Sequence, residues 1–210
     1  MPEDADKSGS VSRRKFLASA GGAIAAAGVA GGLLTKTDGA AVPKPVDEID
    51  DVEGAVDVKL RVNGKIYNLK VQPRVTLLDA LRERLQITGP KRVCDRGNCG
   101  GCTVLKDGKP IYACMMLAVD AQNSALTTVE GIGTPDNLSE LQKQFVEHDG
   151  LMCGFCTPGF VTSCHAALKA NPKATLEDIK RACAGNICRC GTFNRVFEAA
   201  LAAAKKMRSA

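Results

Sequence analysis

Hydrophobic and polar residues alternate over residues 56–62, which is the pattern of a β-strand with one buried face. Asn63-Gly64 follows at once, and this pair favours a two-residue hairpin turn. The returning strand is predicted from the next alternating apolar residues, which are Tyr67, Leu69 and Val71. The first structured element of the chain is therefore expected to be a β-hairpin over residues 56–71.

A helix and a second hairpin are predicted over the next sixty or so residues. Thr76 with Asp79 resembles a capping box, and the helix that follows has an apolar face formed by Leu77, Leu78, Leu81 and Leu85. Lys106-Asp107-Gly108-Lys109 lies between two short apolar runs and predicts another hairpin, and residues 126–129 offer a last strand. This order indicates a small α+β domain, placed at residues 56–131.

From residue 132 the period becomes helical and predicts four helices. Thr134-Pro135 is taken as the start of the first, with Leu138, Leu141 and Phe145 on its inner face. Thr157-Pro158 begins the second, and Asn171-Pro172 ends it.

Thr175 with Asp178 caps the third of these helices, and Thr192 opens the fourth. The third helix directs Leu176, Ile179 and Cys183 inward, and the fourth carries Val196, Ala200 and Leu201. Short connections between four helices indicate an all-α domain at residues 132–210.

Residues 1–41 have the pattern of a bacterial twin-arginine export signal. Ser12-Arg13-Arg14-Lys15-Phe16-Leu17 supplies the paired arginines, residues 16–34 carry no charge, and Gly39-Ala40-Ala41 offers a cleavage site. An uncleaved membrane anchor is the alternative, but 12 of those 19 uncharged residues are Ala or Gly. The expected location is the periplasm, with membrane contact only through an uncleaved signal. Residues 42–55, with two prolines and five acidic residues, are expected to be a linker.

Charge and composition remove several classes of function. The net charge of +5 is spread along the chain without a block of Lys and Arg, which gives no case for nucleic-acid binding. Trp is absent and aromatic residues are few, so a large aromatic groove is not expected. The ten cysteines are the unusual feature, because their spacing is not random.

The first cysteine set reads C-x4-C-x2-C-x11-C and comprises Cys94, Cys99, Cys102 and Cys114. The first three spacings are those of plant-type 2Fe–2S ferredoxins, although the last spacing is shorter. Gly97, Gly100 and Gly101 lie among these cysteines, where the lack of side chains lets backbone N–H groups approach an anionic cluster. These four cysteines are the predicted ligands of one 2Fe–2S cluster.

The second set reads C-x2-C-x31-C-x-C and comprises Cys153, Cys156, Cys188 and Cys190. Each pair directly precedes a predicted helix, so two helix N-termini would face one anionic centre. Arg189 adds a positive charge between two of the ligands. These four cysteines are the predicted ligands of a second cluster, and the helical domain would be organised around it.

A zinc site and disulfide bonds are the alternative interpretations of these cysteines. Structural zinc also takes four cysteines, but C-x-C is a poor zinc clip, and a disulfide within the glycine-rich loop would be strained. A Rieske centre needs two histidine ligands, and neither His148 nor His165 has suitable spacing. Cys164 and Cys183 remain outside both sets and are expected to be buried as small hydrophobic residues.

The two sets, in this order, resemble the iron–sulfur subunit of the molybdenum hydroxylases, the xanthine oxidase family. Besides the first cysteine loop, the resemblance rests on Cys153-Gly154-Phe155-Cys156-Thr157-Pro158-Gly159 and Gly185-Asn186-Ile187-Cys188-Arg189-Cys190, and it covers residues 56–201. It implies a β-grasp ferredoxin domain followed by a four-helix domain, with one 2Fe–2S cluster in each. Cys190-Gly191-Thr192-Phe193 resembles the isoquinoline-type and periplasmic aldehyde oxidoreductase branch.

The resemblance also implies a function and partners. Electrons would come from molybdopterin on a separate large subunit, pass the helical-domain site and then the β-grasp site, and leave to FAD on a third subunit or to a cytochrome. Carried over by position, Cys190 would be the ligand closest to the pterin. The family usually has Gln before the first helical-domain cysteine; Met152 stands there instead, so one hydrogen bond to the cofactor is in question. A free-standing two-cluster ferredoxin is the other redox alternative.

Overall fold

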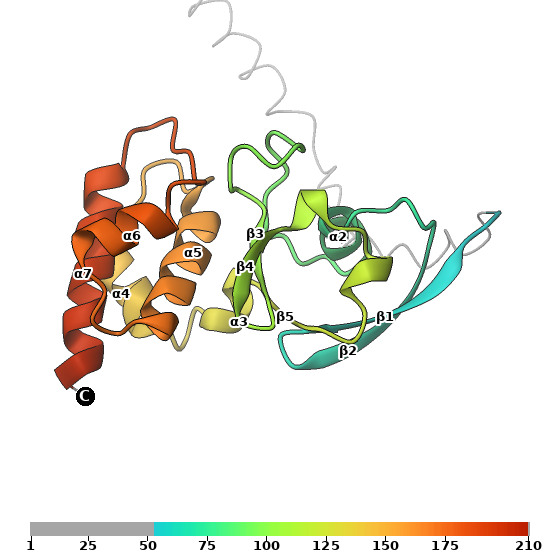
Figure 1. Ribbon diagram of the computed structural model, residues 1–210, viewed down its shortest axis with the longest axis horizontal. Coiled ribbons are helices and arrows are strands. Elements are labelled where there is room, and N and C mark those ends of the chain that lie inside the picture. Colours follow the sequence, from blue (N-terminus) through green and yellow to red (C-terminus); the bar gives the residue numbers. More distant parts are fainter. Residues whose placement is uncertain (1–52, 210) are drawn as a thin grey trace, which may run out of the picture. The chain divides into compact units, whose positions relative to one another are not determined.

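The computed structural model describes residues 53–209, in which a mixed β-sheet with short helices precedes a group of longer helices (Figure 1). The predicted signal, residues 1–41, and residues 42–52 of the predicted linker lie outside the described residues. The α+β class, with a ferredoxin-like half followed by a helical half, is confirmed. Within residues 53–209, none of the helices combines the length and apolar character needed to span a membrane.

Two hairpins form most of the sheet, whose strand order is β2-β1-β5-β3-β4. Strand β1 (Val56–Val62) pairs antiparallel with β2 (Lys65–Val71), and β3 (Thr103–Lys106) pairs antiparallel with β4 (Lys109–Tyr112). Strand β5 (Ala125–Thr127) lies between the hairpins, parallel to β1 and antiparallel to β3. The last strand is therefore one residue earlier at its start than predicted, and Val129 is already helical.

The core of the ferredoxin half lies between the sheet and a short helical segment. Helix α2 (Leu77–Asp79) continues as a π-helical turn over Ala80–Arg84, and the Thr76 hydroxyl accepts the Asp79 amide at 3.1 Å, as the sequence predicted. Its leucines pack with the apolar face of β1; the buried members of this cluster include Leu77, Leu78, Leu81, Val58, Leu60 and Val62. Two single-turn 3₁₀ segments, Ala113–Met115 and Val119–Ala121, complete this half.

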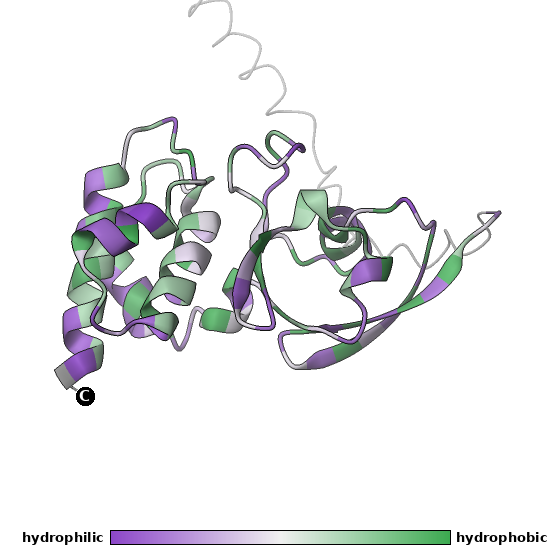
Figure 2. Cartoon of the chain, in the orientation of Figure 1, coloured by the Kyte–Doolittle hydropathy of each residue, from purple (hydrophilic) through white to green (hydrophobic). Residues whose placement is uncertain are grey.

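The helical half has its own core. Helices α4 (Glu140–Glu147), α5 (Thr157–Ala170), α6 (Leu176–Ala182) and α7 (Phe193–Ser209) surround a buried cluster centred on Phe145, Phe160 and Ile179. Figure 2 shows hydrophobic and hydrophilic bands on these helices, as expected for elements with one buried and one exposed face. The short helix α3 (Val129–Ile132) also packs its Val129 and Ile132 against this core.

Two of the helix predictions are wrong in detail. The first long helix begins after Ser139, not at Thr134-Pro135, because Ser139 and Gln142 form a complete capping box whereas Thr134 and Asn137 close a tight turn with paired backbone hydrogen bonds. Leu176, predicted to point inward, is 39% exposed, since it is the first residue of α6 and only Ile179 and Cys183 reach the core.

Candidate iron–sulfur sites

The first cysteine set gathers around the loop between α2 and β3. Cys102 and Cys114 are buried with their sulfur atoms 3.4 Å apart, and the Cys94 thiol contacts that of Cys99. Backbone amides point at two of these sulfurs: Gly97 donates to Cys114 and Asn98 donates to Cys94, both at 3.3 Å. Amides aimed at sulfur are what an anionic thiolate cluster needs, so this loop fits the group.

Glycine lets this loop follow the path that brings the amides in. Gly97 and Gly100 have φ values of +72° and +67°, in the left-handed region that costs other residues free energy. A Cβ atom at Gly97 would also meet the Met115 side chain at 3.0 Å. The predicted need for glycine beside the cysteines therefore has a backbone cause that the structure displays.

The second set lies where two helices begin. Cys156 is the N-cap of α5, and the Cys188 sulfur lies 3.1 Å from the Thr192 hydroxyl and 3.5 Å from the Thr192 amide, at the start of α7. The Cys153 thiol contacts that of Cys190, and the Cys156 thiol contacts that of Cys188. The predicted convergence of two helix N-termini on the second set is thus what the structure has. The sequence analysis treated Thr192 only as a helix start, whereas its hydroxyl and amide also contact the Cys188 sulfur.

The pKa values of these thiols indicate that four thiolates in one group would need positive charge between them. Burial, with the neighbouring Cys114 thiol, raises the pKa of Cys102 to about 12, and burial with the Cys188 thiol raises the pKa of Cys156 to about 12. Burial also opposes ionisation of Cys188, but hydrogen bonds from the Thr192 hydroxyl and amide outweigh it and lower its pKa to about 7. Without positive charge nearby, Cys102 and Cys156 would stay protonated near neutral pH, so not all four thiols of either set would be available as thiolates.

The contacts join the thiols two by two in both sets. Within residues 53–209, no three side chains of Cys, His, Asp or Glu are gathered around one point as a single metal ion would require. Four cysteine thiolates are the ligand set that would hold a 2Fe–2S cluster in each group. All ten cysteines are free, so the disulfide reading does not describe this structure. The eight sequence-predicted ligands lie in their two expected groups.

Cys164 and Cys183 form a separate pair in the helical core, as predicted for small buried residues. They are 0% and 3% exposed, and their sulfur atoms are 3.4 Å apart. The neighbouring thiol of Cys183, together with burial, raises the pKa of Cys164 well above its usual value. These two thiols lie in neither ligand group.

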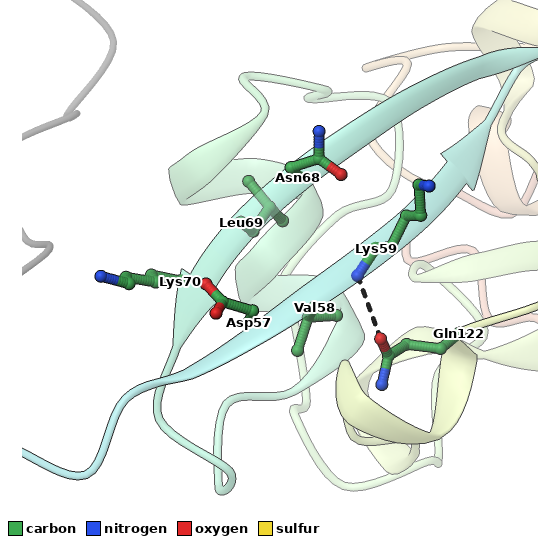
Figure 3. A pocket seen from close by; sticks show the side chains of 7 residues that line it. All are labelled: Asp57, Val58, Lys59, Asn68, Leu69, Lys70 and Gln122. Carbon is green, nitrogen blue, oxygen red and sulfur yellow. Dashed lines mark hydrogen bonds between the residues drawn. The ribbon is translucent and has the colours of Figure 1, made fainter.

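One surface pocket lies beside the second cysteine set, and another lies on the β-sheet. The first pocket, of about 350 Å³, is lined by Cys190 and Met152, the two residues expected near the pterin, and by Thr192 and the ion-paired Asp149 and Arg195. Met152 is 71% exposed there. The other, of about 460 Å³, lies on the β1–β2 hairpin, where the Lys59 amide donates to Gln122, and it contains no cysteine (Figure 3).

Comparison with known proteins agrees with this geometry. Residues 60–127 match the 2Fe-2S iron-sulfur cluster binding domain family, and residues 128–201 match the [2Fe-2S] binding domain family. The chain is 43% identical over 165 residues to the aldehyde oxidoreductase iron-sulfur-binding subunit PaoA of Escherichia coli K12, covering 71% of this chain and 72% of that one. It is 40% identical over 146 residues to the nicotine 6-hydroxylase small subunit of Paenarthrobacter nicotinovorans, covering 70% and 88%.

A solved structure gives the same result. One chain of the quinoline 2-oxidoreductase from Pseudomonas putida 86 superposes with a TM-score of 0.70 at 37% identity, over 74% of this chain and 98% of that one. Both matched domain families bind 2Fe–2S clusters, which overturns the zinc alternative. With two cysteine sets in two such domains and these relatives, the chain belongs to the small iron–sulfur subunits of the molybdenum hydroxylase family.

Proposed function

We propose that this chain is the electron-transfer subunit of an exported molybdenum hydroxylase that oxidises an aldehyde or an N-heterocycle. When bound, two 2Fe–2S clusters would supply one-electron redox chemistry, and the chain would supply eight thiolates, oriented amides and two domains with their own packed cores. The relatives support the substrate class, since they are named for aldehyde and nicotine oxidation. The oxidation itself would take place on a large molybdopterin-binding partner subunit.

The surface beside Cys190 supports this partner. Cys153 and Cys190 are the exposed cysteines of the second set, whereas Cys102 and Cys114 of the first set are buried. Large apolar side chains that lie near these cysteines in sequence are exposed; they are Leu151 (42% exposed), Met152 (71%), Phe155 (50%) and Ile187 (55%). Leu151 and Met152 line the same pocket as Cys190, and apolar side chains that gather at an exposed place are typical of a protein interface. Electrons from the partner would thus enter at Cys153/Cys190 and leave through the first set to FAD on a third subunit or to a cytochrome.

The proposed location is the periplasm. It is supported by the twin-arginine pattern of residues 12–17 and by the expectation that clusters are inserted before folded export. Fractionation of cells expressing the full chain, compared with an Arg13→Lys, Arg14→Lys double variant, tests the route: cluster-containing protein should accumulate in the cytoplasm for the variant. Wild-type protein that stays in the cytoplasm would contradict this part of the proposal.

Replacement of single ligands tests the electron-transfer role. Cys190→Ser should remove the paramagnetic signal of the helical-domain cluster, and Cys94→Ser should remove the other signal. Cys183→Ala, which changes a buried cysteine outside both sets, should keep both signals. Iron analysis, resonance spectra of the reduced protein and turnover of the native assembly with a redox dye measure these effects. Persistence of both signals in Cys190→Ser would contradict the assignment.

Analysis of the native assembly tests the partners. Protein purified from its source should contain molybdenum and iron, with flavin present if the acceptor subunit is a flavoprotein. Purification of this chain alone, with its clusters but with no molybdenum-containing partner, would favour the free-standing ferredoxin instead.

A further inference from the structure

The two cysteine sets meet at a buried polar junction built around Asn186. The Asn186 side-chain amide donates from Nδ2 to the backbone carbonyl of Gly100 at 3.1 Å, and its Oδ1 accepts from the Ser163 hydroxyl at 2.8 Å. Asn186 is only 5% exposed, so neither bond is replaced cheaply by water. One side chain thereby joins the first cysteine loop, helix α5 and the loop that carries Cys188.

A backbone hydrogen bond beside this junction connects the two sets almost directly. The Ile187 amide donates to the carbonyl of Cys99 at 3.0 Å. Cys99 belongs to the first set, and Ile187 is the residue before Cys188 of the second set. Asn186 shares a peptide bond with Ile187, and Gly100 shares one with Cys99, so the side-chain bond and the backbone bond run parallel between the same two loops.

The junction is closely packed where the two loops meet α5. A Cβ atom at Gly100 would meet Asn186 Nδ2 at 2.5 Å and the Gly185 carbonyl at 2.6 Å, and a Cβ atom at Gly159 of α5 would collide with the Gly100 carbonyl. The Tyr112 hydroxyl donates to the Gly185 carbonyl at 3.4 Å. The two loops and α5 are therefore in close contact at this point, and loss of the Asn186 contacts is expected to let the loops separate.

The chemistry of the junction selects asparagine. A backbone carbonyl can only accept a hydrogen bond, so the group facing Gly100 must be a donor, while the Ser163 hydroxyl donates to the opposite side of the same amide. Aspartate has the same shape but would oppose an oxygen to the Gly100 carbonyl. We propose that Asn186 is a positioning residue that fixes the separation of the two cluster sites by holding the Ile187–Cys99 hydrogen bond in place.

This inference rests on the proposed function, and its test measures the spacing of the clusters instead of turnover. In the fully reduced holoprotein, each cluster carries an unpaired spin, and the splitting of the two resonance signals falls steeply as the spins move apart. The variants are Asn186→Ala, Asn186→Asp and the milder Ser163→Ala. Gln144→Leu is the matched control, since it also removes a buried amide from the helical half but one bonded to Glu140 and Glu147 of α4.

The expected result for both Asn186 variants is full iron content, loss or narrowing of the splitting, and faster hydrogen exchange of the peptide that contains the Ile187 amide. Ser163→Ala should show a smaller change of the same kind, and Gln144→Leu should keep the wild-type splitting. Wild-type splitting in both Asn186 variants would overturn the inference. If those variants do not take up iron, wild-type splitting and exchange in Ser163→Ala would overturn it. Wild-type protein without two paramagnetic signals would refute the proposed function itself.

Discussion

Glycine at position 100 avoids two free-energy costs, which are backbone strain and a steric collision. Replacement by alanine would impose both, and comparison with a second glycine separates them. Gly100 has a φ of +67°, and an added Cβ would lie 2.5 Å from Asn186 Nδ2 and 2.6 Å from the Gly185 carbonyl. Gly108, in the turn between β3 and β4, has a φ of +80° and nothing within 4 Å of an added Cβ. Gly108→Ala is therefore a matched control with the same backbone strain and no collision.

The size of the difference follows from these distances. A non-glycine residue in the left-handed region costs about 1–2 kcal/mol, which applies to both variants. Overpacking against groups that cannot move adds about 1–3 kcal/mol, and a backbone carbonyl is such a group. Gly100→Ala should thus destabilise the protein by about 1–3 kcal/mol more than Gly108→Ala, which corresponds to about 2–12 °C in the thermal midpoint for a chain of this size.

The assay is thermal unfolding of the cluster-containing protein at one scan rate, followed by far-ultraviolet and visible circular dichroism. The visible signal reports the clusters, and Gly100→Ala should lose it at a lower temperature than Gly108→Ala. Equal midpoints for the two variants would mean that the loops have space between them, and the tight junction argued from Gly100 would be wrong.

Three further predictions concern the helical half. Ser139→Ala should lower the free energy of unfolding by about 0.5–2 kcal/mol in denaturant titrations, because the serine hydroxyl caps α4. Cys164 should resist alkylation at pH 8 in the folded protein and react after unfolding, because its pKa lies well above the usual value. The Thr175 amide and hydroxyl hold the pKa of Asp178 below its usual range, so this contact stabilises above the unfolded pKa of about 3.9 and is lost as pH falls through the lower folded value. Asp178→Asn should accordingly flatten the stability profile in acid, as measured by urea unfolding across pH.

The sequence predicted best those features that local chemistry decides. The two-residue turns at Asn63-Gly64 and Asp107-Gly108 are where they were expected, with φ values of 50° and 80° in each turn. These conformations are left-handed, and few residues other than asparagine, aspartate and glycine adopt them readily. The Thr175–Asp178 capping box is likewise a contact within one helical turn, and it is present.

Features that depend on distant contacts were predicted less well. Thr134-Pro135 has the local chemistry of a helix start, and the prediction placed the start there without considering Ser139, which is the observed N-cap. The Ser139–Gln142 pair satisfies two backbone groups reciprocally, and Leu141 and Phe145 reach the core from the helix that it begins. Leu176 fits the apolar period of α6, but the first turn of that helix projects beyond the core.

The cysteine sites fall between these two cases, and Gly100 shows why. Spacing grouped the eight candidate ligands into two sets, and the sequence analysis accounted for Gly100 by close approach to a cluster. The structure adds a second demand on the same residue, since its carbonyl accepts from Asn186, 86 positions along the chain. No periodicity or spacing reports a contact over that separation. Gly100 therefore belongs to the loop of the first cysteine set and also contacts the loop that carries Cys188. The geometry of the first set thus depends on how the second loop folds.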